Sequence, residues 1–282
     1  MRHRGELTDQ EWERLKPHLP PEKPETGRPN VDHRQIINGI LWRERTGAPW
    51  RDLPERYGPW STVYSRFWRW REAGVWDRIF AAVQQEADAA GEVDWDVQFV
   101  DGSVIRAHQH AAGAKRGAPE TEALGRSQGG FSTKVHLKAE GQGKPLTVLL
   151  TPGQQHEATV LAPLMHHGAI RRPGRGRPRI RPHRVSGDKG YTGRQHRAAL
   201  RRRGIRYTIA KRRTVRRTGP FDRATYRRRH LIENLFARCK QYRALATRYE
   251  HRGLPPYLRW SLTHRYRLRR QLSPSHAEMT LG

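Results

Sequence analysis

Four residues between positions 226 and 240 have side chains and a spacing that would place a set of reactive groups on one face of a helix. Tyr226, Arg229, Glu233 and Lys240 stand at relative positions 0, 3, 7 and 14 in the segment YRRRHLIENLFARCK. At about 3.6 residues per turn these offsets fall on one helical face. A carboxylate flanked by two cations and a phenol is an unusual set for one face. The alternative is a solvated charged face, the common role of a glutamate in an Arg-rich helix.

Two aspartates upstream of this stripe favour the chemical interpretation. Asp101 stands inside the apolar run WDVQFVDGSVI, where a carboxylate is costly to bury alone, and Asp188 stands in SGDKGYTG at the end of a short strand. The expected element order is three strands, helix, strand, helix, strand, helix. In a sheet of this kind the first and fourth strands can be neighbours, so the two aspartates can meet. The late helix then brings in Glu233.

Three converging carboxylates repel one another unless divalent cations lie between them. Oxygen-only ligands with water select Mg²⁺ or Mn²⁺. Two such ions about 4 Å apart activate an attacking oxygen and stabilise a leaving one in phosphodiester chemistry. Lys189 and Tyr191, beside Asp188, either assist such a site or anchor its loop. Four histidines are interpreted as scattered surface residues rather than a metal site: His108, His110, His166 and His167.

The charge of the chain points to a polyanionic partner. Lys and Arg together number 55 against 27 acidic residues, a formal net charge of +28 over 282 residues. Such a charge opposes a compact fold unless a polyanion shares the surface, and nucleic acid is the first candidate. Arg outnumbers Lys by 46 to 9, and guanidinium groups suit bidentate contacts with phosphate and guanine. A ribosomal-type or nucleoid protein without chemistry is the alternative from a different class.

Cysteine usage and hydropathy suggest a soluble, cytoplasmic protein. Cys239 is the single cysteine, so no disulfide can form within one chain, and a reducing compartment fits. No stretch approaches 18 consecutive apolar residues, and the start of the chain lacks an apolar signal core. We therefore expect no membrane partner.

Residues 1–92 are expected to form a small all-α, helix-turn-helix-like domain that binds DNA. Thr8 and Asp32 are predicted N-caps of the first two helices. A third helix, expected to begin at Ser61, interleaves Arg66 and Arg69 with aromatic residues, and we predict that these two arginines contact DNA. The alternative is a core helix with buried aromatics and solvated arginines.

Residues 93–270 are expected to form an α/β domain, followed by a disordered tail at 271–282. Strands are predicted at 95–105, 131–139, 145–151, 184–187 and 205–210. Helices are predicted at 157–167, 194–203, 226–240 and 255–270.

The chain resembles the DDE transposases of bacterial insertion sequences, which have a ribonuclease-H-like core. Asp101, Asp188 and Glu233 look like the carboxylate triad of that family. The spacing Tyr226-x2-Arg229-x3-Glu233-x6-Lys240 matches the Y-R-E-K signature of one large branch, and SGDKGY is similar to its second-aspartate motif. The segments GRP, TGAPWRDLPERYG and WSTVYSRFWRW resemble the DNA-binding module that precedes many such cores.

This resemblance implies a ribonuclease-H-like mixed sheet flanked by helices and a specific set of roles. Asp101, Asp188 and Glu233 would be catalytic and hold two Mg²⁺ or Mn²⁺ ions. Arg229 and Lys240 would contact DNA phosphates near the cut, and Tyr226 would position the transposon end.

The implied reaction is cleavage at the terminal repeats followed by strand transfer into target DNA. The implied partners are double-stranded DNA, at the transposon ends and at the target, and further copies of the chain in a dimer or larger assembly. A ribonuclease-H-type nuclease without strand transfer and a non-catalytic DNA-binding protein are the two rivals.

Overall fold

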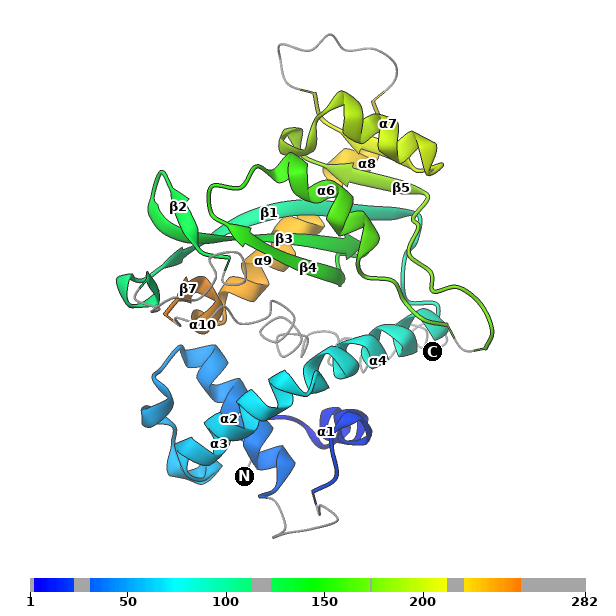
Figure 1. Cartoon of the computed structure of the whole chain (residues 1–282). Coiled ribbons are helices and arrows are strands. Elements are labelled where there is room, and N and C mark those ends of the chain that lie inside the picture. Colours follow the sequence, from blue (N-terminus) through cyan, green and yellow to red (C-terminus); the bar gives the residue numbers. More distant parts are fainter. Residues whose placement is uncertain (1–2, 23–30, 113–122, 173, 212–220, 250–282) are drawn as a thin grey trace, which may run out of the picture. The chain divides into compact units, whose positions relative to one another are not determined.

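The computed structural model describes residues 3–22, 31–112, 123–172, 174–211 and 221–249 (Figure 1). These residues form two compact units, one up to Ile79 and the other from Phe80 onward. The division between the units falls inside helix α4 (Val75–Ala89). The helix expected at 255–270 and the tail at 271–282 lie outside the described residues, and the domain boundary at 92/93 stays a prediction.

The first unit is helical, as predicted. It contains α1 (Asp9–Leu15), α2 (His33–Thr46), α3 (Trp60–Glu72) and the start of α4, with 3-10 turns at Lys16–His18, Trp50–Asp52 and Glu55–Tyr57. The predicted N-caps are confirmed: Thr8 forms a capping box with Glu11, and Asp32 accepts from the Arg34 backbone N–H. The N-cap of α3 lies two residues earlier than predicted, at Pro59 rather than Ser61.

A mixed sheet organises the second unit. Strand β1 (Val97–Ala107) lies at its centre, antiparallel to β3 (Gly130–Glu140) and parallel to β5 (Arg184–Gly187). Strand β4 (Pro145–Pro152) pairs antiparallel with β3, and β6 (Arg206–Ile209) pairs parallel with β5. The order β4-β3-β1-β5-β6 makes β1 and β5, the first and fourth strands predicted from the sequence, direct neighbours, as expected.

Two short strands that were not predicted from the sequence extend this sheet. Strand β2 (Gly125–Ser127) pairs with β3, and β7 (Thr247–Arg248) pairs with β1. Both are two or three residues long, so their sequences carry no alternation that could reveal them.

Helices cover both faces of the sheet. Helix α6 (Glu157–His166) contacts β1, β3 and β4, whereas α9 (His230–Lys240) packs against β1. In Figure 1 these two helices lie on opposite sides of the strands. Helix α7 (Arg194–Arg202) precedes β6, α8 (Arg223–Arg227) precedes α9, and α10 (Arg243–Ala246) follows it.

The predicted helix 226–240 is broken into α8 and α9. At the junction the Arg229 N–H donates to the Tyr226 carbonyl and the Leu231 N–H donates to the Arg228 carbonyl. These are i to i−3 bonds, tighter than the α-helical pattern. Tyr226 therefore lies on α8, Arg229 is the N-cap residue of α9, and Glu233 lies one turn further on.

The main core of the second unit lies between the sheet and helices α6 and α7. It contains Val100, Leu164, Val185, Tyr191 and Leu200 among other buried residues. Each fully buried aliphatic side chain contributes about 1.5–3 kcal/mol to stability. This core fixes β1 beside β5, and the functional side chains stand where both strands leave it.

Candidate active site

Asp101 and Asp188 stand next to each other across two parallel strands. The register of β1 and β5 pairs Val100 with Gly187, so each aspartate is the next residue along its strand. Residues 97–100 of β1 are buried, and the strand becomes partly exposed at Asp101. The Asp188 side chain accepts from the Gly190 N–H at 2.8 Å, and Gly102 N–H donates to Asp101 Oδ1 at 2.9 Å. Both carboxylates are thus held at the point where the apolar core ends.

Arg229 links Asp101 to the helix that carries Glu233. Its Nη2 lies 3.3 Å from Asp101 Oδ2 and 3.6 Å from Glu233 Oε1. The side chains of Arg229 and Asp101 are 10% and 16% exposed, whereas that of Glu233 is 58% exposed. The guanidinium therefore neutralises a nearly buried aspartate, and Glu233 approaches the pair from the solvent side.

The electrostatics of Asp101 reflect all three acidic residues. Burial raises the pKa of its carboxyl to about 6, against the lowering effects of Arg229 and of the Gly102 N–H. Asp188 and Glu233 raise this pKa further through charge repulsion. Asp188 and Glu233 therefore lie close enough to Asp101 for their charges to affect its titration.

Tyr226 contacts Arg229 from the other side. The Arg229 guanidinium lies 5.3 Å from the Tyr226 ring, and its Nη1 donates to the Tyr226 hydroxyl at 3.4 Å. Tyr226 also packs against Phe221, with ring centroids 5.2 Å apart. The structure thus brings together four of the predicted residues, Tyr226, Arg229, Glu233 and Asp101, although the helix is broken between them.

Lys240 lies apart from this cluster. It is exposed and ends α9, seven residues after Glu233, which is about 10 Å along the helix axis. The predicted contact of Lys240 with DNA phosphates near the cut stays a prediction.

Glu157 and Tyr191 are further residues of this site that sequence reasoning missed or left open. Glu157, the first residue of α6, pairs with Lys134 at 3.1 Å, and a Cβ on Gly190 would overlap its Oε2. The Tyr191 hydroxyl is buried without a hydrogen-bond partner among the described residues, and burial raises its pKa well above 10. Glu157, Asp101 and Asp188 raise that pKa further. An acid in the first turn of a helix is ordinarily a dipole partner, so Glu157 carries no sequence signal.

The donor set fits a hard divalent cation, although this conformation does not yet group it for one. Carboxylate oxygens with water are the ligands that Mg²⁺ and Mn²⁺ prefer. Among the described residues, no three acidic, histidine or cysteine side chains are close enough together to hold a metal ion. Arg229 occupies the position between Asp101 and Glu233. In this conformation the guanidinium supplies the positive charge that the carboxylates require.

In the first unit, the two arginines predicted to contact DNA differ in exposure. Arg66 is 6% exposed, its Nη1 lies 3.3 Å from His33 Nδ1, and its guanidinium lies 5.6 Å from the Trp70 ring. Arg69, on the same helix, is exposed. The Arg66 side chain is thus packed in the core between Trp70 of its own helix and His33 of α2, and not exposed at the surface. Arg69 keeps the position that the sequence predicts.

Comparisons with protein families identify the chain. The family described as "Transposase DDE domain" matches residues 95–253, which is more than half of the sequence. A second family, described as "Putative transposase of IS4/5 family", matches residues 7–80. The domain of residues 95–253 therefore belongs to the DDE class of transposases. The chain is a member of the DDE transposase family, in the insertion-sequence group that the second match names.

Individual relatives match parts of the chain. An uncharacterised protein of Sinorhizobium fredii is 40% identical over 39% of this chain and 83% of its own length. A 16.2 kDa protein of insertion element IS402 from Burkholderia cepacia is 39% identical over 36% of this chain and 73% of its own length. The "Putative transposase for insertion sequence element IS402" of the same organism is 36% identical over 43% of this chain and 55% of its own length.

A solved structure of the Mos1 transposase paired-end complex aligns with 84% of this chain and 87% of its own chain, at 10% identity and a TM-score of 0.24. This likeness is too low to bear on fold or function. Separately, none of the helices in the described part of the chain is long and apolar enough to cross a membrane.

Proposed function

We propose that this transposase binds the terminal repeats of its insertion sequence, cleaves the phosphodiester bonds there and joins the ends to target DNA. The observation that carries the proposal is the adjacency of Asp101 and Asp188 at the end of the β1–β5 pair, with Arg229 connecting Asp101 to Glu233. Membership of the DDE family and a net charge of +28 support the choice of DNA as substrate.

Asp101, Asp188 and Glu233 would hold two Mg²⁺ or Mn²⁺ ions. When bound, such ions activate an attacking oxygen and stabilise the leaving oxygen of a phosphodiester. Water would attack phosphorus while the bond to the 3′ oxygen breaks, leaving a 3′-hydroxyl at the transposon end. That hydroxyl would then attack a phosphodiester of the target and displace its 3′ oxygen.

The cations of α8 and α9 would act on the substrate rather than on the metals. Arg229 is placed to move from the carboxylates onto a phosphate oxygen once cations arrive, because its guanidinium already lies within 3.6 Å of both acids. A cation so placed neutralises charge that grows on the phosphoryl oxygens. Tyr226 holds the guanidinium on its far side, and Lys240 would contact the DNA backbone further along.

The test uses the full chain and DNA carrying the element's own ends. Asp101→Asn, Asp188→Asn and Glu233→Gln should each abolish Mg²⁺-dependent cleavage while DNA affinity stays within about twofold, since each change keeps shape and removes only charge. Joining of labelled ends to a plasmid separates transposition from plain nuclease activity. Cleavage at the wild-type rate by any of the three variants would overturn the assignment of that residue.

The proposed reaction joins two transposon ends to the target in one event, so it calls for more than one copy of the protein. We propose that the protein acts as a homodimer or larger complex on paired ends. We also propose that the first unit recognises the terminal repeat, with Arg69 exposed at its surface. Light scattering with and without end DNA measures the assembly. A monomer that cleaves and joins two ends would contradict this part of the proposal.

A further inference from the structure

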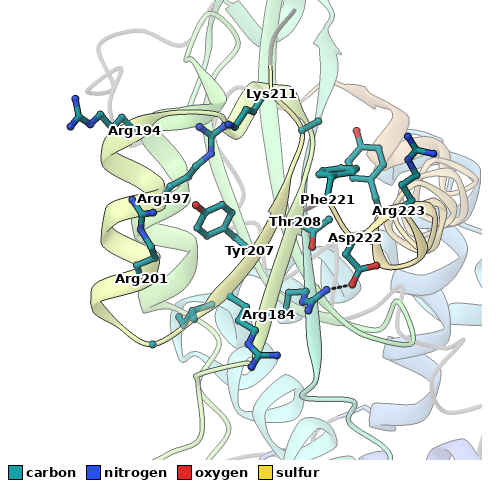
Figure 2. A pocket seen from close by; sticks show the side chains of 15 residues that line it. Arg184, Arg194, Arg197, Arg201, Tyr207, Thr208, Lys211, Phe221, Asp222 and Arg223 are labelled. Atoms are coloured by element: carbon teal, nitrogen blue, oxygen red, sulfur yellow. Dashed lines mark hydrogen bonds and ion pairs between the residues drawn. The ribbon is translucent and has the colours of Figure 1, made fainter. Parts of the chain in front are cut away.

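A basic cavity lies in the second unit on the side of β6, α7 and α8 (Figure 2). Its volume is about 1260 Å³. Seven of its fifteen lining residues are Arg or Lys, and Asp222 is the single acid among them. That balance selects an anionic ligand over a neutral or cationic one.

The single acid does not neutralise the cavity. Asp222 caps α8, where its side chain accepts from the Thr225 N–H, and it also pairs with Arg184 of β5. This pair ties α8 to the sheet, and the lining contains six further Arg and Lys residues. In Figure 2 the arginines of α7 stand on one side of the cavity, Phe221 and Arg223 on the other, and Tyr207 between them.

The cations of α7 form a regular row. Arg194, Arg197 and Arg201 occupy positions i, i+3 and i+7, so they share one helical face, while Leu200 points into the core. Arg194 and Arg201 are exposed, as is Arg223 on the opposite wall. A row of guanidinium groups about 10 Å long matches a run of successive phosphates better than a single small anion.

Tyr226 connects this cavity with the carboxylate site. Its side chain lines the cavity, and its hydroxyl accepts from Arg229, which pairs with Asp101. A ligand in the cavity would therefore contact Tyr226, whose hydroxyl is bonded to Arg229, the partner of Asp101.

We propose that this basic cavity binds the sugar–phosphate backbone of a DNA duplex segment beside the segment being cleaved. The inference rests on the proposed action on DNA and names a second contact surface for that substrate. Phosphate contacts of this kind fix the register of the duplex on the protein without reading its sequence.

The test is photo-crosslinking of the full chain, in EDTA, to duplex DNA with azidophenacyl groups on backbone phosphorothioates. We expect adducts on peptides that contain Arg194–Arg201 and Phe221–Tyr226. A variant with Arg194, Arg201 and Arg223 changed to alanine should lower these adducts at least fivefold. It should also lower the salt dependence of binding by up to about 3 phosphate equivalents.

A second triple variant controls for charge alone. Arg175, Arg177 and Arg202 are exposed and lie outside the cavity lining, so changing them to alanine removes the same charge. Adducts at the cavity peptides should persist in this control. Wild-type adducts confined to other peptides, or an equal loss in both variants, would overturn the proposal. Because no metal is present, these outcomes are independent of whether the protein cleaves DNA.

Discussion

Arg66 and Arg229 are both buried arginines that the sequence assigns to DNA, and their surroundings separate them. Arg66, on α3 of the first unit, is 6% exposed and lies against His33 and Trp70. Arg229, at the start of α9 in the second unit, is 8% exposed and lies against Asp101 and Glu233. A cation packed on aromatic rings stabilises a core, whereas one held by two carboxylates can exchange partners when another cation arrives. Burial alone therefore does not distinguish a structural arginine from a functional one.

The largest expected effect is on the functional member of this pair. Arg229→Ala should slow cleavage on saturating DNA by about 100-fold, the size expected for loss of one preorganised donor to developing charge. Its Mn²⁺ affinity, measured by calorimetry, should not fall, because the guanidinium competes with the metal for Asp101 and Glu233. Arg227→Ala, an exposed change two residues away, is the matched control. Wild-type cleavage by Arg229→Ala would make this residue structural, like Arg66.

The structural member should show the reverse pattern. Arg66→Ala should lower the free energy of unfolding by about 2 kcal/mol, because it removes packing against Trp70 and the contact with His33. Arg69→Ala, exposed on the same helix, should change stability by less than about 0.5 kcal/mol. If Arg69 reads a base edge, its variant should instead lose about 1–3 kcal/mol of affinity for the terminal repeat. Chemical denaturation and anisotropy titrations on the full chain measure both quantities.

A third change disturbs the carboxylate cluster without removing any cation. Gly190→Ala places a Cβ against Glu157 Oε2 and within 2.9 Å of Asp188 Oδ1. Displacement of these two carboxylates should slow cleavage about tenfold, roughly 1.4 kcal/mol in activation free energy. The same change in a Glu157→Ala background should cost less, because the overlapping atoms are gone. Additive effects in this double-mutant cycle would show that Glu157 does not shape the site.

The smallest effect concerns a third buried cation, Lys138 of β3, whose Nζ donates to the His167 carbonyl at 2.5 Å. Burial lowers its pKa to about 7 from 10.5. Between pH 7 and 10.5, Lys138 is protonated in the unfolded chain but largely neutral in the folded protein. The free energy of unfolding therefore rises with pH above about 7, and this contribution is lost as the pH falls to about 7. Relative to Lys138→Met, the wild-type protein should gain about 1 kcal/mol between pH 7 and 8. Parallel pH–stability curves would rule out a depressed pKa at this position.

The sequence predicts the sheet and the triad because those signals are local. The apolar residues before Asp101 and the small residues around Asp188 mark two strand ends, and β5 was placed at its observed bounds. The break before Arg229 was not predictable, since it depends on i to i−3 bonds in a segment with no Pro or Gly to mark it. Glu157 and the burial of Arg66 were missed for a related reason. Each has a partner more than 30 positions away, Gly190 for Glu157 and His33 for Arg66.

Strand β1 completes its pairing only after most of the chain exists. Its antiparallel partner β3 follows within about 30 residues, but Val100 pairs with Gly187 and Arg106 pairs with Thr247. Contacts of such long sequence separation form slowly, because the chain must lose the entropy of closing a large loop before the stabilising contacts form. During synthesis residues 97–100 are therefore expected to present an open strand edge to other chains. At high expression, chains that still lack β5 are therefore expected to pair through the open edge of β1 with other chains before they fold.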